Sequence, residues 1–249
     1  MYKYSILIVT LFVIISTTAM PNLNIIELSG TLLYQVKTET ATDSIETALA
    51  NLPTDSLVTA LDNDDARKTF WINIYNAYFQ MLAIRQHKTK PGIFTKKLIT
   101  IAGTKFSLDN IEHGILRRYR WKLSLGYLPQ ACPSKIIKQL GVSKIDYRIH
   151  FALNCGDKSC PPIAFYNYAN INRQLEIATT SFLTNETEID TANKLVGASK
   201  IMQWFKADFG GKKGTLKVLS QYLKYDFTGY RIAYKPYSWD EKLKNYHSF

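Results

Sequence analysis

One stretch of sequence decides the fold: ARKTFWINIYNAYFQMLAIR, residues 66–85. Apolar and aromatic side chains fall on nearly every face of a helix drawn through it, which is typical of a helix buried on all sides. Asp64 or Asp65, just before it, is expected to cap its N-terminus. Asn73 and Asn76 lie three positions apart and share one face. Because buried amides need hydrogen-bond partners, we expect both to join a polar network or a site.

Shorter segments surround this helix. Ile45 and Leu49 are spaced as on a helix face, and Pro53 separates that helix from a second one near Leu57. Ser107 is expected to cap a helix, and Gly141 to end one. We expect further helices over residues 108–119, 134–140, 170–183, 200–209 and 215–225, and strands over 98–102, 105–106, 148–155 and 231–234. Helices predominate and no βαβ alternation appears, which predicts an α+β protein: a mostly helical, single compact domain with a small sheet or hairpins.

The N-terminus has the pattern of a secretory signal peptide. Lys3 is the only charged residue among the first 26, and an apolar run over residues 5–15 is followed by small residues up to Ala19. The alternative is an uncleaved anchor, but the run is shorter than the ~20 apolar residues of a spanning helix. We therefore expect a signal peptide over residues 1–19, an N-terminal helical extension over 20–64 and the main domain over 65–249. The expected location is extracytoplasmic, periplasmic or secreted, with no transmembrane segment after signal removal.

The composition is that of a basic globular protein. Among 249 residues, 31 Lys and Arg face 20 Asp and Glu, and 46% of residues are hydrophobic, which excludes a disordered or collagen-like chain. Residues 196–249 hold ten Lys or Arg against four Asp or Glu, and a second basic cluster covers residues 117–122. Such clusters attract nucleic acid, anionic lipid or acidic polysaccharide, or are solvated faces. No nucleic-acid-binding motif accompanies them, so we expect an anionic cell-envelope polymer or a protein as partner, and no nucleic acid.

Polar residues that fit chemistry concentrate around the expected strand 148–155. One hypothesis is a thiol enzyme for hydrolysis or acyl transfer, with Cys160 as nucleophile and His150 as base. His113 and Glu112 would support them, with Asn73 or Asn76 orienting an imidazole. We also expect Arg117, Asn154 and Trp71 to contribute to binding.

A disulfide between Cys155 and Cys160 is the competing interpretation. The two residues lie five positions apart around Gly156, and disulfides persist in exported proteins. In that case the histidines are internal hydrogen-bonding residues and the protein is a non-catalytic binding or scaffold module. Redox activity and zinc binding are less favoured, because the Cys-x-x-Cys spacing is absent and Cys-x4-Cys has no second pair. We expect no metal and no cofactor.

Several of these segments together resemble one protein family. FWINIYNA (70–77), LDNIEHGILR (108–117) and IHFALNCGDKSCPP (149–162) look like the signatures of the DUF547 family, and KIMQWFKADF (200–209) and YSW (237–239) are similar to its later part. The chain departs from the family pattern at Tyr147, where Pro is usual, and at Asn110, where Asp is usual.

The resemblance implies an exported bacterial protein without an established reaction or cofactor. The family's characteristic positions fall here on residues whose character is similar to that of an active site: Asn73, Asn76, Glu112, His113, Arg117, His150, Cys155 and Cys160. Plant relatives vary at the two Cys positions, which fits a disulfide that depends on the compartment.

Overall fold

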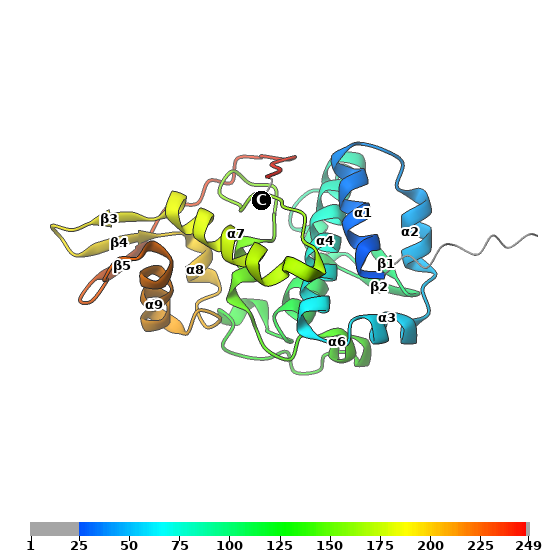
Figure 1. Ribbon diagram of the computed structural model, residues 1–249, viewed down its shortest axis with the longest axis horizontal. Helices are drawn as coiled ribbons and strands as arrows, with labels where there is room; N and C mark the ends of the chain where they lie inside the picture. The colour runs from blue at the N-terminus through cyan, green and yellow to red at the C-terminus, as the bar shows by residue number, and fades with distance from the viewer. Residues whose placement is uncertain (1–24, 248–249) are drawn as a thin grey trace, which may run out of the picture.

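The structure is a computed structural model, and it describes residues 25–247. Helices predominate and two small sheets accompany them, so the predicted α+β class is confirmed (Figure 1). The expected signal peptide lies outside the described residues. Within residues 25–247, no helix combines the length and apolar character needed to cross a membrane.

The α-helices are α1 (Ile25–Lys37), α2 (Asp43–Ala50), α3 (Thr54–Ala60), α4 (Asp64–Gln80), α5 (Gly92–Thr95), α6 (Lys135–Leu140), α7 (Ile171–Glu186), α8 (Lys200–Trp204) and α9 (Gly211–Leu223). Two π-helices are η1 (Met81–Arg85) and η2 (Asn110–Leu116), and three short 3-10 helices are η3 (Lys122–Ser124), η4 (Tyr147–Phe151) and η5 (Tyr168–Asn170). The strands are β1 (Ile99–Ile101), β2 (Thr104–Phe106), β3 (Glu188–Asp190), β4 (Leu195–Ala198) and β5 (Arg231–Tyr234).

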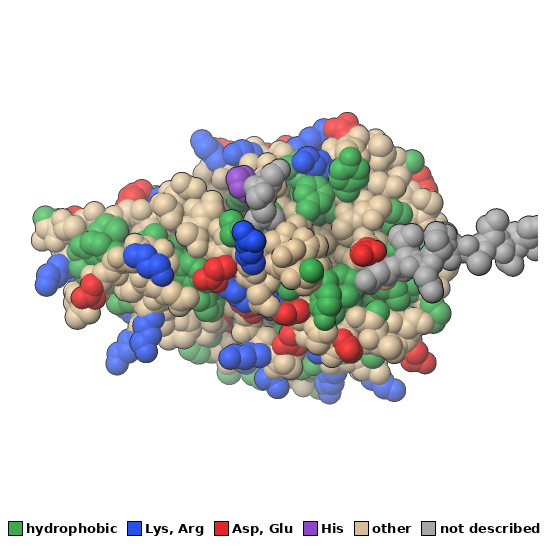
Figure 2. All heavy atoms as spheres, in the orientation of Figure 1, with side chains coloured by type: hydrophobic (Ala, Val, Ile, Leu, Met, Phe, Trp, Pro, Cys, Tyr) green, Lys and Arg blue, Asp and Glu red, His purple; other side chains and the backbone are tan. Residues whose placement is uncertain are grey.

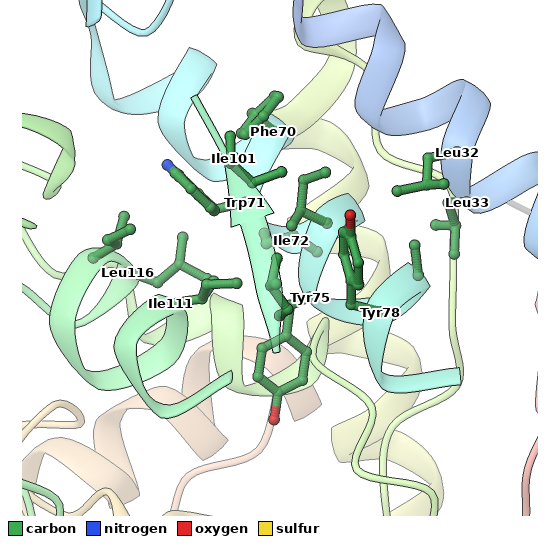
Figure 3. Packing of buried hydrophobic residues seen from close by; sticks show 14 of the residues in the cluster. Leu32, Leu33, Phe70, Trp71, Ile72, Tyr75, Tyr78, Ile101, Ile111 and Leu116 are labelled. Atoms are coloured by element: carbon green, nitrogen blue, oxygen red, sulfur yellow. The ribbon is translucent and has the colours of Figure 1, made fainter. Parts of the chain in front are cut away.

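Helix α4 is the centre of the larger hydrophobic cluster, as its sequence predicts. Nearly all its side chains from Ala66 to Gln80 are buried, and α1 packs along it. Figure 3 shows Tyr75 at the edge of this cluster, with its hydroxyl directed away from the other labelled side chains. The helix therefore supplies both the core and one polar group at the boundary of the core.

A second hydrophobic cluster lies at the other end of the long axis, between α7, α8, α9 and the three-stranded sheet (Figure 1). In that sheet β4 pairs antiparallel with β3 and parallel with β5, so that Val196 lies opposite both Ile189 and Ile232. Helix α7 joins the two clusters, because Leu175 belongs to the first and Phe182 to the second.

Two local predictions are wrong, and the expected helix over 200–209 ends at Trp204, with turns over 205–210. The N-cap of α4 is Asn63, whose Oδ1 accepts from the backbone N–H groups of Asp65 and Ala66 at 3.0 Å each; the expected caps lie inside the first turn. Residues 148–155 do not form a strand. Asp146 caps the 3-10 helix η4, and an irregular segment follows, so the expected alternation of His150, Ala152 and Asn154 on one strand face does not occur. An apolar run buried on all sides carries no periodicity that separates a short helix from a strand.

Candidate functional site

A pocket of ≈ 260 Å³ opens where η2, η4 and α8 meet. Apolar side chains form most of its wall, among them Phe94, Leu153, Ile201, Trp204 and Phe205. The titratable side chains that line it are Tyr75, Asp109, Glu112, His113, Lys122, His150 and Tyr237. The structure thus brings together Glu112, His113 and His150, three of the residues predicted from the sequence.

The π-helix η2 carries two of these residues. The Ser107 hydroxyl accepts from the Asn110 backbone N–H at 3.0 Å, and the Asn110 side chain accepts from the Ser107 N–H at 3.2 Å, so the predicted Ser107 cap is confirmed. The Arg117 N–H then bonds to the Glu112 carbonyl, five residues back, at 2.9 Å. Short π-helical segments are uncommon and occur frequently at functional sites. Glu112 and His113, consecutive on this wide turn, both reach the pocket.

A buried ion pair lies next to the pocket. The Arg117 guanidinium donates to both carboxylate oxygens of Asp208, at 2.6 and 3.1 Å, and both side chains are almost completely inaccessible. The ring of Phe205 lies 4.6 Å from the Arg117 guanidinium carbon. Burial opposes ionisation of Asp208, but hydrogen bonds from His150 and Arg117 outweigh it and lower the pKa of this carboxyl to about 2. Asp208 is therefore a fixed negative charge paired with a fixed positive one.

His150 is oriented by the same carboxylate. Its Nε2 lies 2.9 Å from Asp208 Oδ2, and its ring stacks on Phe205 with centroids 3.9 Å apart. Burial lowers the pKa of His150, although the hydrogen bond and the charge of Asp208 act in the opposite direction. A neutral imidazole that donates from Nε2 carries its lone pair on Nδ1. His150 therefore has one nitrogen held by Asp208 and a basic nitrogen left over.

His113 has the complementary arrangement. Its Nδ1 lies 2.8 Å from Arg117 Nη1, and because a guanidinium only donates, Nδ1 is the acceptor and the ring proton lies on Nε2. Burial, and after it the charge of Arg117, lowers the pKa of His113 to about 3, while Asp109 acts in the opposite direction. His113 is therefore a neutral hydrogen-bond donor at neutral pH.

Glu112 is the second unusual acid of the pocket. Its Oε2 accepts a hydrogen bond from the Tyr75 hydroxyl at 3.1 Å. Burial raises the pKa of Glu112, and the charges of Arg117 and His150 and the bond from Tyr75 offset this only in part. Burial, and then Glu112, raise the pKa of Tyr75. The site thus holds one carboxyl displaced toward its protonated form beside a neutral imidazole, the combination that general acid–base catalysis uses.

The two cysteines of the third signature segment are joined. The Sγ atoms of Cys155 and Cys160 lie 1.94 Å apart, at disulfide distance, and the Tyr237 hydroxyl lies 3.2 and 3.0 Å from them. Cys155 lines the pocket and Cys160 lies behind it, buried. In this state neither sulfur is a thiolate, so Cys160 could serve as a nucleophile only after reduction. Asp157 lies near both sulfurs, but bonded sulfurs do not supply the thiolates that zinc prefers.

The other predicted residues are buried and do not line the pocket. Asn76 donates to the Ala152 carbonyl and accepts from the Asn154 N–H, both at 2.9 Å, and Asn154 donates to the Pro161 carbonyl at 2.7 Å. These bonds hold the irregular segment after η4. Asn73 donates to the Tyr166 carbonyl at 2.8 Å, and Trp71 is buried in the larger cluster. Arg117 is enclosed in the ion pair and offers no free face to a ligand.

A surface loop closes over the ion pair. Residues 121–128, which we call the apolar loop, include Gly126 with φ +86°, and a Cβ at Gly126 would come within 2.5 Å of Asp208 Oδ1 and 2.6 Å of Arg117 Nη2. The neighbouring Leu125 carbonyl accepts from the Ala207 N–H at 3.0 Å. Position 126 therefore requires glycine on two grounds, its backbone conformation and the closeness of the ion pair.

Asp208 is a candidate site residue that the sequence did not predict. It lies in a turn after α8, between Ala207 and Phe209, far along the chain from His150. One signal was present: Asp208 lies between Ala207 and Phe209 in KIMQWFKADF, a segment that resembles the later part of the family. An isolated Asp in a short helix is otherwise typical of a solvated surface.

Comparison with known proteins gives one match. No curated protein and no solved structure matches the chain. A family model described as "Protein of unknown function, DUF547" matches residues 58–183, which include the central helix, η2 and the disulfide segment. That match covers half of the chain, and it confirms the resemblance drawn from the signature segments. The chain therefore belongs to the DUF547 family.

Proposed function

We propose that the pocket is the active site of a His-dependent hydrolase or acyl transferase acting on a small, largely apolar carbonyl substrate. The observation that carries the proposal is the hydrogen bond from His150 to Asp208, made by a histidine that lines the same pocket as Glu112. A buried carboxylate that fixes one imidazole nitrogen leaves the other in the tautomer that accepts a proton.

His150 is the general base in this mechanism. Its Nδ1 takes a proton from water or from an acceptor hydroxyl while that oxygen bonds to the substrate carbonyl carbon. Asp208 keeps the ring orientation and stabilises the imidazolium that forms. The lowered pKa of His150 keeps the base in its neutral, competent form at neutral pH.

Glu112 and His113 act on the leaving group and on the carbonyl oxygen of the substrate. With its raised pKa, Glu112 supplies a proton to the leaving group as the carbonyl–leaving-group bond breaks. Through Nε2–H, His113 donates a hydrogen bond to the carbonyl oxygen as negative charge develops on it. The mostly apolar wall supports a substrate that carries apolar groups beside the carbonyl.

The thiol hypothesis remains a second candidate, because Cys155 lines the pocket. It requires that the disulfide first be reduced, after which Cys160 would be the nucleophile and His150 the base. We also propose an extracytoplasmic location. It is supported by the apolar run over residues 5–15 and by a disulfide of the kind that persists in oxidising compartments.

The test uses the oxidised full-length chain with 4-nitrophenyl acetate and 4-nitrophenyl butyrate as probes. We expect His150→Gln and Glu112→Gln to lower kcat/KM by about a hundredfold or more. The control is His87→Gln, which makes the same change at an exposed histidine. Melting temperatures and near-UV circular dichroism identify variants that fold.

Three other outcomes would decide against this mechanism. If the His150→Gln variant folds and turns over the probe at the same rate as the His87→Gln variant, His150 is not the base. Turnover that appears only after reduction, and disappears in Cys160→Ala, selects the thiol mechanism. Absence of turnover together with salt-sensitive binding of an acidic polysaccharide selects a non-catalytic module for an anionic envelope polymer.

A further inference from the structure

The apolar loop exposes an unusual amount of hydrophobic surface. Its large apolar side chains are exposed to the following extents: Trp121 46%, Leu123 74%, Leu125 41%, Tyr127 54% and Leu128 54%. The other exposed large hydrophobic residues among 25–247 lie singly along the chain. Scattered exposed apolar residues are ordinary, but a concentration of this kind marks an interaction site.

The chain around the loop carries positive charge only. Residues 113–145 contain seven Lys or Arg and no Asp or Glu. Arg117 is buried in the ion pair, and Lys122 pairs with Asp109 at 2.6 Å. Arg118, Lys135 and Lys138 are exposed without an ion pair. In Figure 2 basic side chains lie along the lower edge of the view, beside α6 and over α9.

The loop is held in its exposed conformation by its own hydrogen bonds. The Ser124 hydroxyl donates to the Trp121 carbonyl at 2.8 Å and accepts from the Leu128 N–H at 3.1 Å. The Leu125 carbonyl ties the loop to Ala207, and an isolated β-bridge joins Arg120 to Pro129 at its base. Its apolar side chains are thus presented by an ordered segment, so binding would cost little ordering entropy.

We propose that the apolar loop docks on an anionic lipid bilayer, with its apolar side chains in the interfacial region and the flanking Lys and Arg against the headgroups. Charge complementarity favours this partner, because residues 113–145 contain no acidic residue and three of their cations, Arg118, Lys135 and Lys138, are exposed and form no ion pair within residues 25–247. The combination of Trp, Tyr and Leu with flanking Lys and Arg is typical of interfacial segments.

This proposal is independent of the reaction proposed above. It also places the pocket near the lipid surface, because Lys122 belongs to both the loop and the pocket wall. A ligand that partitions into the bilayer would then have a short path to the pocket.

The test measures binding of the full-length chain to vesicles of phosphatidylcholine, with and without phosphatidylglycerol. An environment-sensitive fluorophore on Cys132 reports the surroundings of the loop, since Cys132 is exposed and the other two cysteines are bonded. We expect sedimentation with the anionic vesicles, a blue shift of the fluorophore and its quenching by nitroxide-labelled lipid. Binding through any other part of the chain would leave the fluorophore in water.

Two pairs of substitutions test the apolar and the electrostatic contributions to vesicle binding separately. We expect Leu123→Ser with Leu128→Ser, and Arg118→Gln with Lys135→Gln, each to weaken binding by about tenfold or more. The controls are Ile189→Ser, on β3, and Lys194→Gln with Arg231→Gln, in the turn before β4 and at the start of β5. These exposed changes leave stability nearly unaltered, which a melting curve checks.

Three results would overturn the proposal. The first is absence of binding to anionic vesicles. The second is binding that leaves the Cys132 fluorophore unshifted and the loop variants unimpaired. The third is an oligomer in solution, without vesicle binding, that the loop variants dissociate; it would assign the loop to an interface between copies of this chain.

Discussion

Asp208 accepts a hydrogen bond from His150 at 2.9 Å, although 58 positions separate the two residues. The same carboxylate binds Arg117, whose guanidinium in turn donates to His113. One acid therefore sets the position of one imidazole directly and of the other through the guanidinium. Because Arg117 donates to His113 while Asp208 accepts from His150, the remaining nitrogens of the two rings have opposite character, a donor on His113 and an acceptor on His150.

Asp208→Asn should destabilise the fold strongly. The change leaves the buried Arg117 without its counter-charge, and breaking a buried pair by removing one partner costs about 3–5 kcal/mol. Urea denaturation measures the free energy of unfolding. Asp55→Asn, the same change at an exposed acid of α3, should cost less than about 1 kcal/mol. Equal losses in the two variants would contradict the structural role of the ion pair.

Stability should rise with pH through the range in which His113 titrates. The folded-state pKa of His113 is about 3, below its ordinary value of 6.5. Between these two pH values the unfolded chain therefore binds a proton that the folded chain does not bind. The contribution of His113 to the free energy of unfolding is fully present above pH 6.5. As the pH falls toward 3, that free energy decreases by up to about 5 kcal/mol. Denaturation curves at several pH values check this.

His113→Gln removes this titration, so its stability should depend less steeply on pH between about 3 and 6.5. His87→Gln, at an exposed site, should keep the slope of the parent chain. If the stability of His113→Gln depends on pH as steeply as that of the parent chain, His113 is accessible to protons in the folded state.

Alkylation of the native protein should modify one cysteine. Cys132 is exposed and free, whereas Cys155 and Cys160 are bonded, so mass spectrometry should find one label before reduction and three after it. Rapid alkylation of Cys160 without reduction, below the pH at which ordinary thiols react, would instead identify an activated nucleophile.

Two glycine substitutions separate backbone strain from steric conflict. Gly126→Ala and Gly103→Ala both place a Cβ at positive φ, which costs about 1–2 kcal/mol. At Gly103 the Cβ meets nothing within 4 Å, whereas at Gly126 it meets the Asp208–Arg117 pair. Gly126→Ala should therefore lose at least about 1 kcal/mol more, and should lower turnover or ligand binding in the pocket. Equal melting temperatures would show that the loop moves freely off the ion pair.

The central helix and the short hairpin could be predicted because their sequences carry unambiguous patterns. A largely apolar stretch of twenty residues is too long for an ordinary strand and therefore predicts a helix. Gly103, between two alternating segments, predicts a turn. In contrast, the sequence predicts a strand over 148–155, with His150, Ala152 and Asn154 on one face, whereas residues 147–151 form η4. Ile149, His150 and Phe151 are all buried there, so no exposed face sets a period. The π register of η2 also has no sequence signal, because it differs from an α-helix only in which carbonyl each N–H meets.

The candidate site was predictable in its residue types and not in its connections. Glu112, His113 and His150 stood out as titratable groups among apolar neighbours, and they do line one pocket. Asn73 and Asn76 stood out for the same reason, yet their amides bind backbone groups. A sequence shows that a buried polar group needs a partner; only the fold shows whether that partner is the chain itself or a ligand. Asp208 could be assigned only once the fold placed it beside His150.

Gly126 has a consequence for how signals pass through the molecule. The apolar loop rests on the carboxylate that holds His150, so a contact on the loop and a ligand in the pocket act on one shared set of atoms. Thermodynamic linkage then makes the effect mutual: if surface attachment alters the affinity of the pocket, occupancy of the pocket must alter the strength of attachment by the same factor. This coupling is direct because glycine has no side chain between the loop backbone and the ion pair that could absorb a displacement of the loop.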